Sequence, residues 1–193
     1  MPRTEQQYEQ IREQKKALIL QAALELFADE GFHSTSISKI ARSANISKGL
    51  MYNYFESKEA LLKEIVISGF SDLTGTFDPN HDGILTTEEL EYFINQTFET
   101  LKSNTKYWKL YFAIMMQPSV LKMFEDDFAK IIRSIFKMLE EYFRRKGYEN
   151  PEIESKLFGA ILDGLAFHYV TDPSNFPLEE VKKTLINRYV RKH

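Results

Sequence analysis

Oxygen-bearing residues stand at regular spacing in a polar segment, residues 78–89. Calcium takes six to eight hard oxygen ligands, and a calcium loop supplies them from positions 1, 3, 5, 7, 9 and 12, with a glycine at position 6 for the sharp turn. Gly83 stands at position 6 of this segment. The ligand positions are held by Asp78, Asn80, Asp82, Ile84 (through its backbone carbonyl), Thr86 and Glu89. The spacing therefore predicts a Ca²⁺ site.

The residues on either side of this loop have the apolar pattern of an EF-hand. Phe70 and Phe77 precede the loop and Leu90 follows it, whereas Thr74 stands where an apolar residue is usual. A plain polar turn before a helix start is the simpler interpretation, but such a turn needs no glutamate at the twelfth position. Mg²⁺ prefers a tighter octahedron with more water, so Ca²⁺ is the expected ion.

The composition is that of an ordinary soluble protein, with 43% hydrophobic and 27% charged residues among 193. The absence of cysteine excludes disulfides and thiolate metal sites. No apolar run approaches the ~18 residues of a membrane span, so we expect a cytoplasmic protein without a membrane partner. No nucleophile–base pair or glycine-rich phosphate loop is present, and we expect no enzymatic activity.

The elements around the loop are predicted to be helical throughout. Apolar residues recur at spacings of three, four and seven, and no β-alternating run is found. The expected fold is all-α, with about nine helices. Their expected ranges are from about 11 to Gly31, a short helix after Ser36, 48–55, 57 to about 70, 90–101, 106–117, about 119–146, 151 to about 171 and 177 to about 192.

The second and third predicted helices have the spacing of a helix-turn-helix, braced by the first helix. Ser34, Thr35 and Ser36 offer capping hydroxyls for the first of these helices and Ser47 is expected to cap the second, while Asn45 tolerates the left-handed conformation of the turn. The run GFHSTSISKIARSANISKGLMYNYFESKEALLKEI, from Gly31 to Ile65, resembles the N-terminal domain of the TetR family of bacterial transcriptional regulators. The resemblance implies a helix-turn-helix domain over residues 1–56 and a helical ligand-binding and dimerisation domain over residues 57–193.

This resemblance implies a set of DNA-contacting residues. Polar and basic side chains at the helix starts would meet phosphates, and residues of the recognition helix would reach base edges. Between Ser36 and Lys58 four basic residues face a single acid, Glu56. Met51 and Phe55 are expected on the buried face. The candidate DNA-binding residues are Thr35, Ser36, Lys39, Ser47, Lys48, Gly49, Leu50, Tyr52, Asn53, Tyr54 and Lys58.

The family resemblance also implies a homodimer formed by the last two helices, since two recognition helices must reach successive major grooves. A ligand pocket for a small apolar molecule is a further expectation, because one segment is unusually rich in aromatic and soft side chains. Ordinary core packing is the alternative for such a stripe. The segment comprises Tyr107, Trp108, Tyr111, Phe112 and Met115.

Three functions are compatible with these patterns. The favoured hypothesis is a dimeric transcriptional repressor that binds a palindromic operator in double-stranded DNA. Its DNA binding would be modulated by Ca²⁺ at residues 78–89. In that hypothesis calcium fixes the far end of the fourth helix and biases DNA binding. The second is a regulator that answers to a small apolar ligand, with a structural calcium loop. The third is a calcium-binding interaction protein that does not bind an operator.

Overall fold

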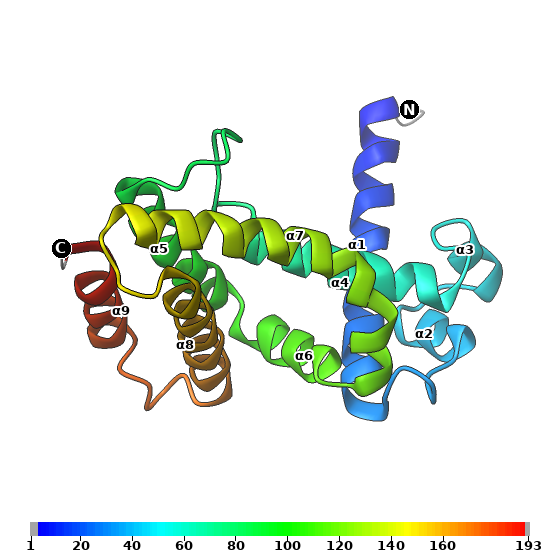
Figure 1. The fold of residues 1–193 in the computed structure, drawn as a ribbon. Helices are drawn as coiled ribbons and strands as arrows, with labels where there is room; N and C mark the ends of the chain where they lie inside the picture. The colour runs from blue at the N-terminus through cyan, green and yellow to red at the C-terminus, as the bar shows by residue number, and fades with distance from the viewer. Residues whose placement is uncertain (1–3, 192–193) are drawn as a thin grey trace. The chain divides into compact units, whose positions relative to one another are not determined.

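The computed structural model describes residues 4–191, and every regular element in that range is helical (Figure 1). This confirms the all-α prediction. Nine α-helices and a terminal π-helix are described: α1 (Glu5–Glu30), α2 (Ile37–Ser43), α3 (Lys48–Tyr52), α4 (Lys58–Thr74), α5 (Thr87–Ser103), α6 (Thr105–Met115), α7 (Pro118–Arg145), α8 (Pro151–Thr171), α9 (Leu178–Ile186) and η1 (Asn187–Arg191).

Local sequence signals set most of the helix ends. Gly31 and Gly147 have φ of 85° and 78°, a positive φ that glycine adopts readily, and each stands where the preceding helix ends. Several boundaries differ from the prediction: α1 begins at Glu5, α4 continues to Thr74 and α5 begins at Thr87. The third helix ends at Tyr52 instead of continuing to residue 55, and the last predicted helix divides into α9 and η1.

The chain forms two compact units, and the division falls within α4, α6 and α7. The first unit comprises the residues up to Gly69 together with Leu110–Val120. Gln117 joins these two segments, because its Nε2 donates to the Phe27 carbonyl at 2.9 Å and its Oε1 accepts from the Phe32 amide at 3.1 Å. The predicted division into domains over residues 1–56 and 57–193 stays a prediction.

The second unit comprises Phe70–Lys109 and the residues from Leu121 onward. In this unit α5 packs against α8, α9 and η1. Aromatic side chains fill the core, with ring centroids 5.7 Å apart for Phe143 and Tyr189 and 5.2 Å apart for Phe158 and Tyr189. The Tyr142 hydroxyl donates to the Tyr189 carbonyl at 3.0 Å, which holds η1 against α7. None of the helices described over residues 4–191 combines the length and apolarity that crossing a membrane requires.

Candidate nucleic-acid interface

The α2–turn–α3 segment has the geometry of a helix-turn-helix, and its caps are those that the sequence predicts. The Ser36 and Ser47 hydroxyls accept from the amides of Lys39 and Leu50 at 3.2 and 3.1 Å. Asn45 has φ of 53°, as predicted for the turn. A hydroxyl that accepts a capping bond still has its hydrogen to donate, so neither serine is prevented from meeting a phosphate.

One side of this segment is buried and fixes the orientation of α3. Ile40 and Met51 are completely buried, and Phe55 is 5% exposed. These positions confirm the prediction that Met51 and Phe55 face the core. With that side fixed, the remaining face of α3 is directed to solvent.

The solvent-facing side carries most of the predicted DNA-binding residues. Tyr54 is half-buried. The exposed members of the set are Ser36, Lys39, Ser47, Lys48, Gly49, Leu50, Tyr52 and Asn53. Lys39 forms an ion pair with Glu30, with Nζ 2.5 Å from Oε2, so its charge is partly neutralised in the free protein. The structure therefore gathers a polar surface around the start of α3.

Two predicted DNA-binding residues have structural roles in this conformation. Thr35 is 1% exposed, and its hydroxyl donates to the carbonyls of Leu26 and Gly31 at 3.2 and 2.9 Å. The Lys58 ammonium donates to the carbonyls of Phe32, His33 and Thr35 at 2.7 to 3.2 Å. Both side chains hold the loop between α1 and α2, so in this conformation their polar groups are engaged there and not with a DNA phosphate.

Arg42 is a basic residue that the sequence reasoning missed. It is exposed in the last turn of α2. Together with Ser38, Asn45, Ser47 and Lys48 it lines a shallow depression between α2 and α3. Its i+4 spacing from Ser38 places both on one face of α2, and that spacing is the signal that could have identified it.

Gly49 has no intramolecular reason to lack a side chain. It lies within α3, and a Cβ built there meets no heavy atom within 4 Å. An ordinary helical position with open space favours alanine over glycine by about 1 kcal/mol. Close approach of another molecule is a physical reason for glycine at such a position.

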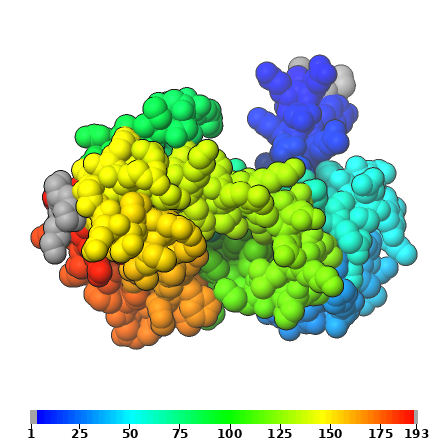
Figure 2. All heavy atoms as spheres, viewed as in Figure 1, coloured from blue at the N-terminus to red at the C-terminus, as the bar shows by residue number. Residues whose placement is uncertain are grey.

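The predicted calcium loop lies between α4 and α5 on the surface of the second unit (Figures 1 and 2). Gly83 has φ of 74°, and its amide donates to Asp78 Oδ2 at 3.2 Å. Asp82 Oδ1 accepts from the Ile84 amide at 2.7 Å. Asp78 Oδ1 is buried and has no hydrogen-bond partner among the described residues. The turn thus forms as predicted, with one carboxylate oxygen left unsatisfied.

The predicted ligands do not converge in this conformation. Glu89 Oε2 accepts from both the amide and the hydroxyl of Thr86 at 2.8 Å, and the Thr86 hydroxyl accepts from the Glu89 amide, so the pair forms a capping box for α5. Within residues 4–191 no group of three or more His, Cys, Asp or Glu side chains is arranged to hold a metal. Side-chain and carbonyl oxygens still match the ligand chemistry of calcium, so the prediction stays a prediction.

Two residues of the predicted ligand-pocket segment belong to the hydrophobic core. Trp108 and Tyr111 are each 2% exposed. The Trp108 indole donates to the Thr100 carbonyl at 2.8 Å, and the Tyr111 hydroxyl donates to the Val66 carbonyl at 3.0 Å. Both polar groups therefore form hydrogen bonds within the protein, in agreement with the alternative of ordinary core packing.

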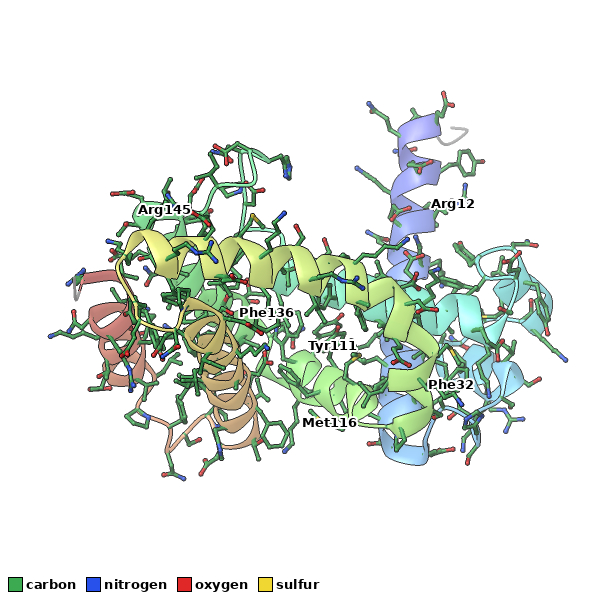
Figure 3. All side chains as sticks on the ribbon, viewed as in Figure 1. Arg12, Phe32, Tyr111, Met116, Phe136 and Arg145 are labelled. Atoms are coloured by element: carbon green, nitrogen blue, oxygen red, sulfur yellow. The ribbon has the colours of Figure 1, made fainter. Side chains whose placement is uncertain are left out.

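A cavity of about 170 Å³ lies elsewhere, inside the second unit. None of the predicted pocket residues (Tyr107, Trp108, Tyr111, Phe112 and Met115) lines it. The cavity is walled by α4, α5, α7, α8 and Phe77, which precedes the calcium loop, and Figure 3 labels one of its α7 residues, Phe136. Its apolar lining residues are Phe70, Phe77, Phe93, Ile132, Ile135, Phe136, Leu139, Phe158 and Leu162, and Thr74, Gly159 and Asp163 complete the wall.

Comparison with known proteins bears on the helix-turn-helix directly. Residues 19–65 match the family model for bacterial regulatory proteins of the tetR family. The HTH-type transcriptional regulator UidR of Escherichia coli (strain K12) is 27% identical over 155 residues, which cover 80% of this chain and 79% of UidR. The chain is thus similar to tetR-family regulators over residues 19–65 and to UidR over most of its length. The tetR-family match covers the whole α2–turn–α3 segment and so includes the exposed face described above.

Two solved structures show the same fold over most of the chain. One is NalD of Pseudomonas aeruginosa, the secondary repressor of the MexAB-OprM multidrug efflux pump. Its TM-score is 0.70 at 23% identity, and the aligned residues make up 93% of this chain and 96% of NalD. The other is FadR of Bacillus subtilis in complex with stearoyl-CoA. Its TM-score is 0.64 at 18% identity, and the aligned residues make up 90% of this chain and 97% of FadR. At these identities the likeness concerns the fold alone.

Proposed function

We propose that this chain is a transcriptional repressor that binds a palindromic operator as a homodimer. The observation that carries the proposal is the start of α3, where Ser47, Lys48 and Gly49 are exposed and Gly49 faces open space. The exposure of Lys48 and Gly49, within a segment that matches the tetR family, is accounted for by DNA binding. We propose repression and not activation because NalD, which has the same fold, is a repressor.

The first test measures operator affinity. Selection from a pool of random duplexes provides the binding sequence, and fluorescence anisotropy at fixed salt provides Kd, since salt alone changes such affinities strongly. Lys48→Ala removes a cation beside the DNA and is expected to weaken binding at least several-fold and to reduce the salt dependence. Gly49→Ala is expected to weaken binding while leaving the fold intact, because only the DNA is close enough to meet the added methyl group.

Lys122→Ala is the matched control for Lys48→Ala. Lys122 is exposed on α7, outside the helix-turn-helix, so the same loss of charge is expected to leave Kd unchanged. Selection that yields no preferred sequence contradicts the proposal. Equal weakening by Lys48→Ala and Lys122→Ala would show that overall charge, and not the α3 surface, controls binding.

We propose in addition that the loop at residues 78–89 binds Ca²⁺ and modulates DNA binding. The unsatisfied Asp78 Oδ1 and the left-handed Gly83 support this proposal. Asp78, Asn80, Asp82 and Thr86 would hold the ion through side-chain oxygens, and Ile84 through its carbonyl. Glu89 would complete the set once its carboxylate leaves the capping box. Calcium changes operator affinity only if it binds the free and DNA-bound forms with different affinity.

The calcium test compares Glu89→Gln with Glu88→Gln. Glutamine at the third helical position preserves a capping box, so Glu89→Gln removes a ligand charge without removing the cap. Calcium is expected to raise the thermal unfolding midpoint of the wild type and of Glu88→Gln, but not that of Glu89→Gln, and operator Kd is expected to follow the same pattern. A wild-type midpoint insensitive to calcium contradicts the site, whereas stabilisation without a change in Kd makes the ion structural.

A second candidate function is a regulator that responds to a small, largely apolar ligand. The cavity of about 170 Å³ in the second unit favours it. Small-molecule sites are apolar clefts with a few placed polar groups, and this cavity has that character. FadR of Bacillus subtilis, which shares the fold, is described in complex with stearoyl-CoA. Addition of a ligand that fits the cavity is expected to weaken operator binding in the anisotropy assay.

A further inference from the structure

The cavity in the second unit contains a single charged side chain, and that side chain is acidic. Of its two polar lining groups, the Thr74 hydroxyl donates to the Phe70 carbonyl at 2.8 Å and is occupied within its own helix. Asp163, on α8, is the other. Within residues 4–191 no hydrogen bond or ion pair engages its carboxylate. The cavity therefore presents one free anionic group to whatever enters it.

Asp163 lies at the mouth of the cavity. More than a third of the residue is exposed, whereas the rings of Phe77 and Phe158 on the cavity wall are 2% and 1% exposed. The apolar surroundings desolvate the carboxyl and raise its pKa, which is the expected result when no cation lies nearby. The cavity thus has an apolar interior and an acidic entrance.

The aromatic wall favours an aromatic guest. Five of the lining residues are phenylalanines, and aromatic rings pack favourably against one another. A volume of about 170 Å³ holds a phenyl ring with a short chain, since an engineered apolar cavity of about 150 Å³ holds benzene. The dimensions suit a small amphiphile with its polar group at the entrance.

We propose that this cavity binds amphiphilic monocations, with an aromatic tail among the phenylalanines and an ammonium group at Asp163. The inference rests on the ligand-responsive form of the proposed function and specifies its ligand class. An amphiphile with a terminal carboxylate would bring two negative charges together at the entrance and is discriminated against. Fatty acids are thereby disfavoured relative to amines of the same length.

Three probes of matched shape test the charge preference: phenylbutylamine, phenylbutanol and phenylbutyrate. Isothermal titration calorimetry on the full chain is expected to rank the amine first and the carboxylate last. The amine should bind roughly fivefold to tenfold more tightly than the alcohol, the difference between a charge-assisted and a neutral hydrogen bond. Asp163→Asn is expected to remove the preference of amine over alcohol while leaving the affinity for the alcohol nearly unchanged.

Glu152→Gln is the matched control on the same helix. Glu152 is exposed and paired with Lys156, away from the cavity, so its substitution should leave the ranking unchanged. Tighter binding of the carboxylate than of the amine overturns the inference, as does failure of the amine to bind. An amine preference that persists in Asp163→Asn overturns it as well.

A separate readout distinguishes this inference from the proposed function. The amine is added to the protein–operator complex, and release of DNA is expected. If the amine binds through Asp163 but the operator Kd does not change, the ligand class stands and the ligand-responsive function fails. If the operator is bound but no amine enters the cavity, the inference fails and the repressor proposal stands.

Discussion

At the scale of single residues, Asp163 links folding stability to pH. Burial raises the pKa of its carboxyl, so the folded protein binds this proton more tightly than the unfolded chain does. For an acid of this kind stability is lost as pH rises from the unfolded towards the folded pKa. Asp163→Asn removes that penalty, and we expect a higher urea midpoint than the wild type at neutral pH. The difference should shrink as pH falls towards the usual Asp pKa.

Glu152 is a control residue, because its pKa is shifted in the opposite direction to that of Asp163. The Lys156 ammonium donates a hydrogen bond to its carboxylate and lowers its pKa. Its ionised form is therefore the favoured one in the folded state, and Glu152→Gln should give no gain in the neutral-pH midpoint. A gain equal to that of Asp163→Asn would show that overall charge, and not desolvation at Asp163, sets the effect.

At the scale of elements, the packing of α6 against α4 depends on Gly69. A Cβ at Gly69 would lie 2.7 Å from Cδ2 of Tyr111, and closer still to Cε2. The ring cannot easily withdraw, because the Tyr111 hydroxyl donates to the Val66 carbonyl at 3.0 Å on the same helix. Gly69→Ala is therefore expected to lower the free energy of unfolding by about 1–3 kcal/mol, the usual cost of overpacking. Urea unfolding at fixed protein concentration measures it.

Gly49→Ala is the matched substitution for this test. Gly49 is also helical, but its added methyl group meets open space, so stability should rise by up to about 1 kcal/mol. The two alanine substitutions are thus expected to have opposite signs. Loss of stability in both would attribute the effect of Gly69→Ala to something other than the Tyr111 ring.

At the scale of the whole molecule, we expect a homodimer formed through α8 and α9. Ile153, Leu157 and Phe167 are 53%, 46% and 43% exposed along α8, and Ile161, Leu165, Val181 and Leu185 line an apolar groove formed with α9 and η1. Leu157→Glu places a charge on this surface and is expected to give monomers and abolish operator binding. Size-exclusion chromatography with light scattering measures the mass.

Leu121→Glu controls for the effect of an added surface charge. Leu121 is 48% exposed on α7, and a protein with this substitution should keep the mass of the dimer. Monomers of the wild type at micromolar concentration would contradict the expected assembly. Dissociation of Leu121→Glu instead of Leu157→Glu would place the interface on α7.

The sequence predicted best those features that depend only on residues close together in the chain. Ser36 and Ser47 cap their helices, Asn45 makes the turn, and Gly83 turns the loop, because each conformation depends on contacts within a few residues. The tetR-family signature is of the same local kind. The all-α fold follows from apolar spacing along single helices, which needs no knowledge of how those helices pack.

Tertiary structure alone decided the roles of side chains that reach across the fold. Lys58 is a predicted DNA-binding residue, but its ammonium group donates to the carbonyls of Phe32, His33 and Thr35. The aromatic segment that includes Tyr111 became core, while the cavity formed from residues as distant in sequence as Phe70 and Asp163. Local pattern determines which helices form and where they end. Long-range packing determines which polar groups are left for a partner, because a hydroxyl or ammonium group is used by whichever acceptor the fold brings near it.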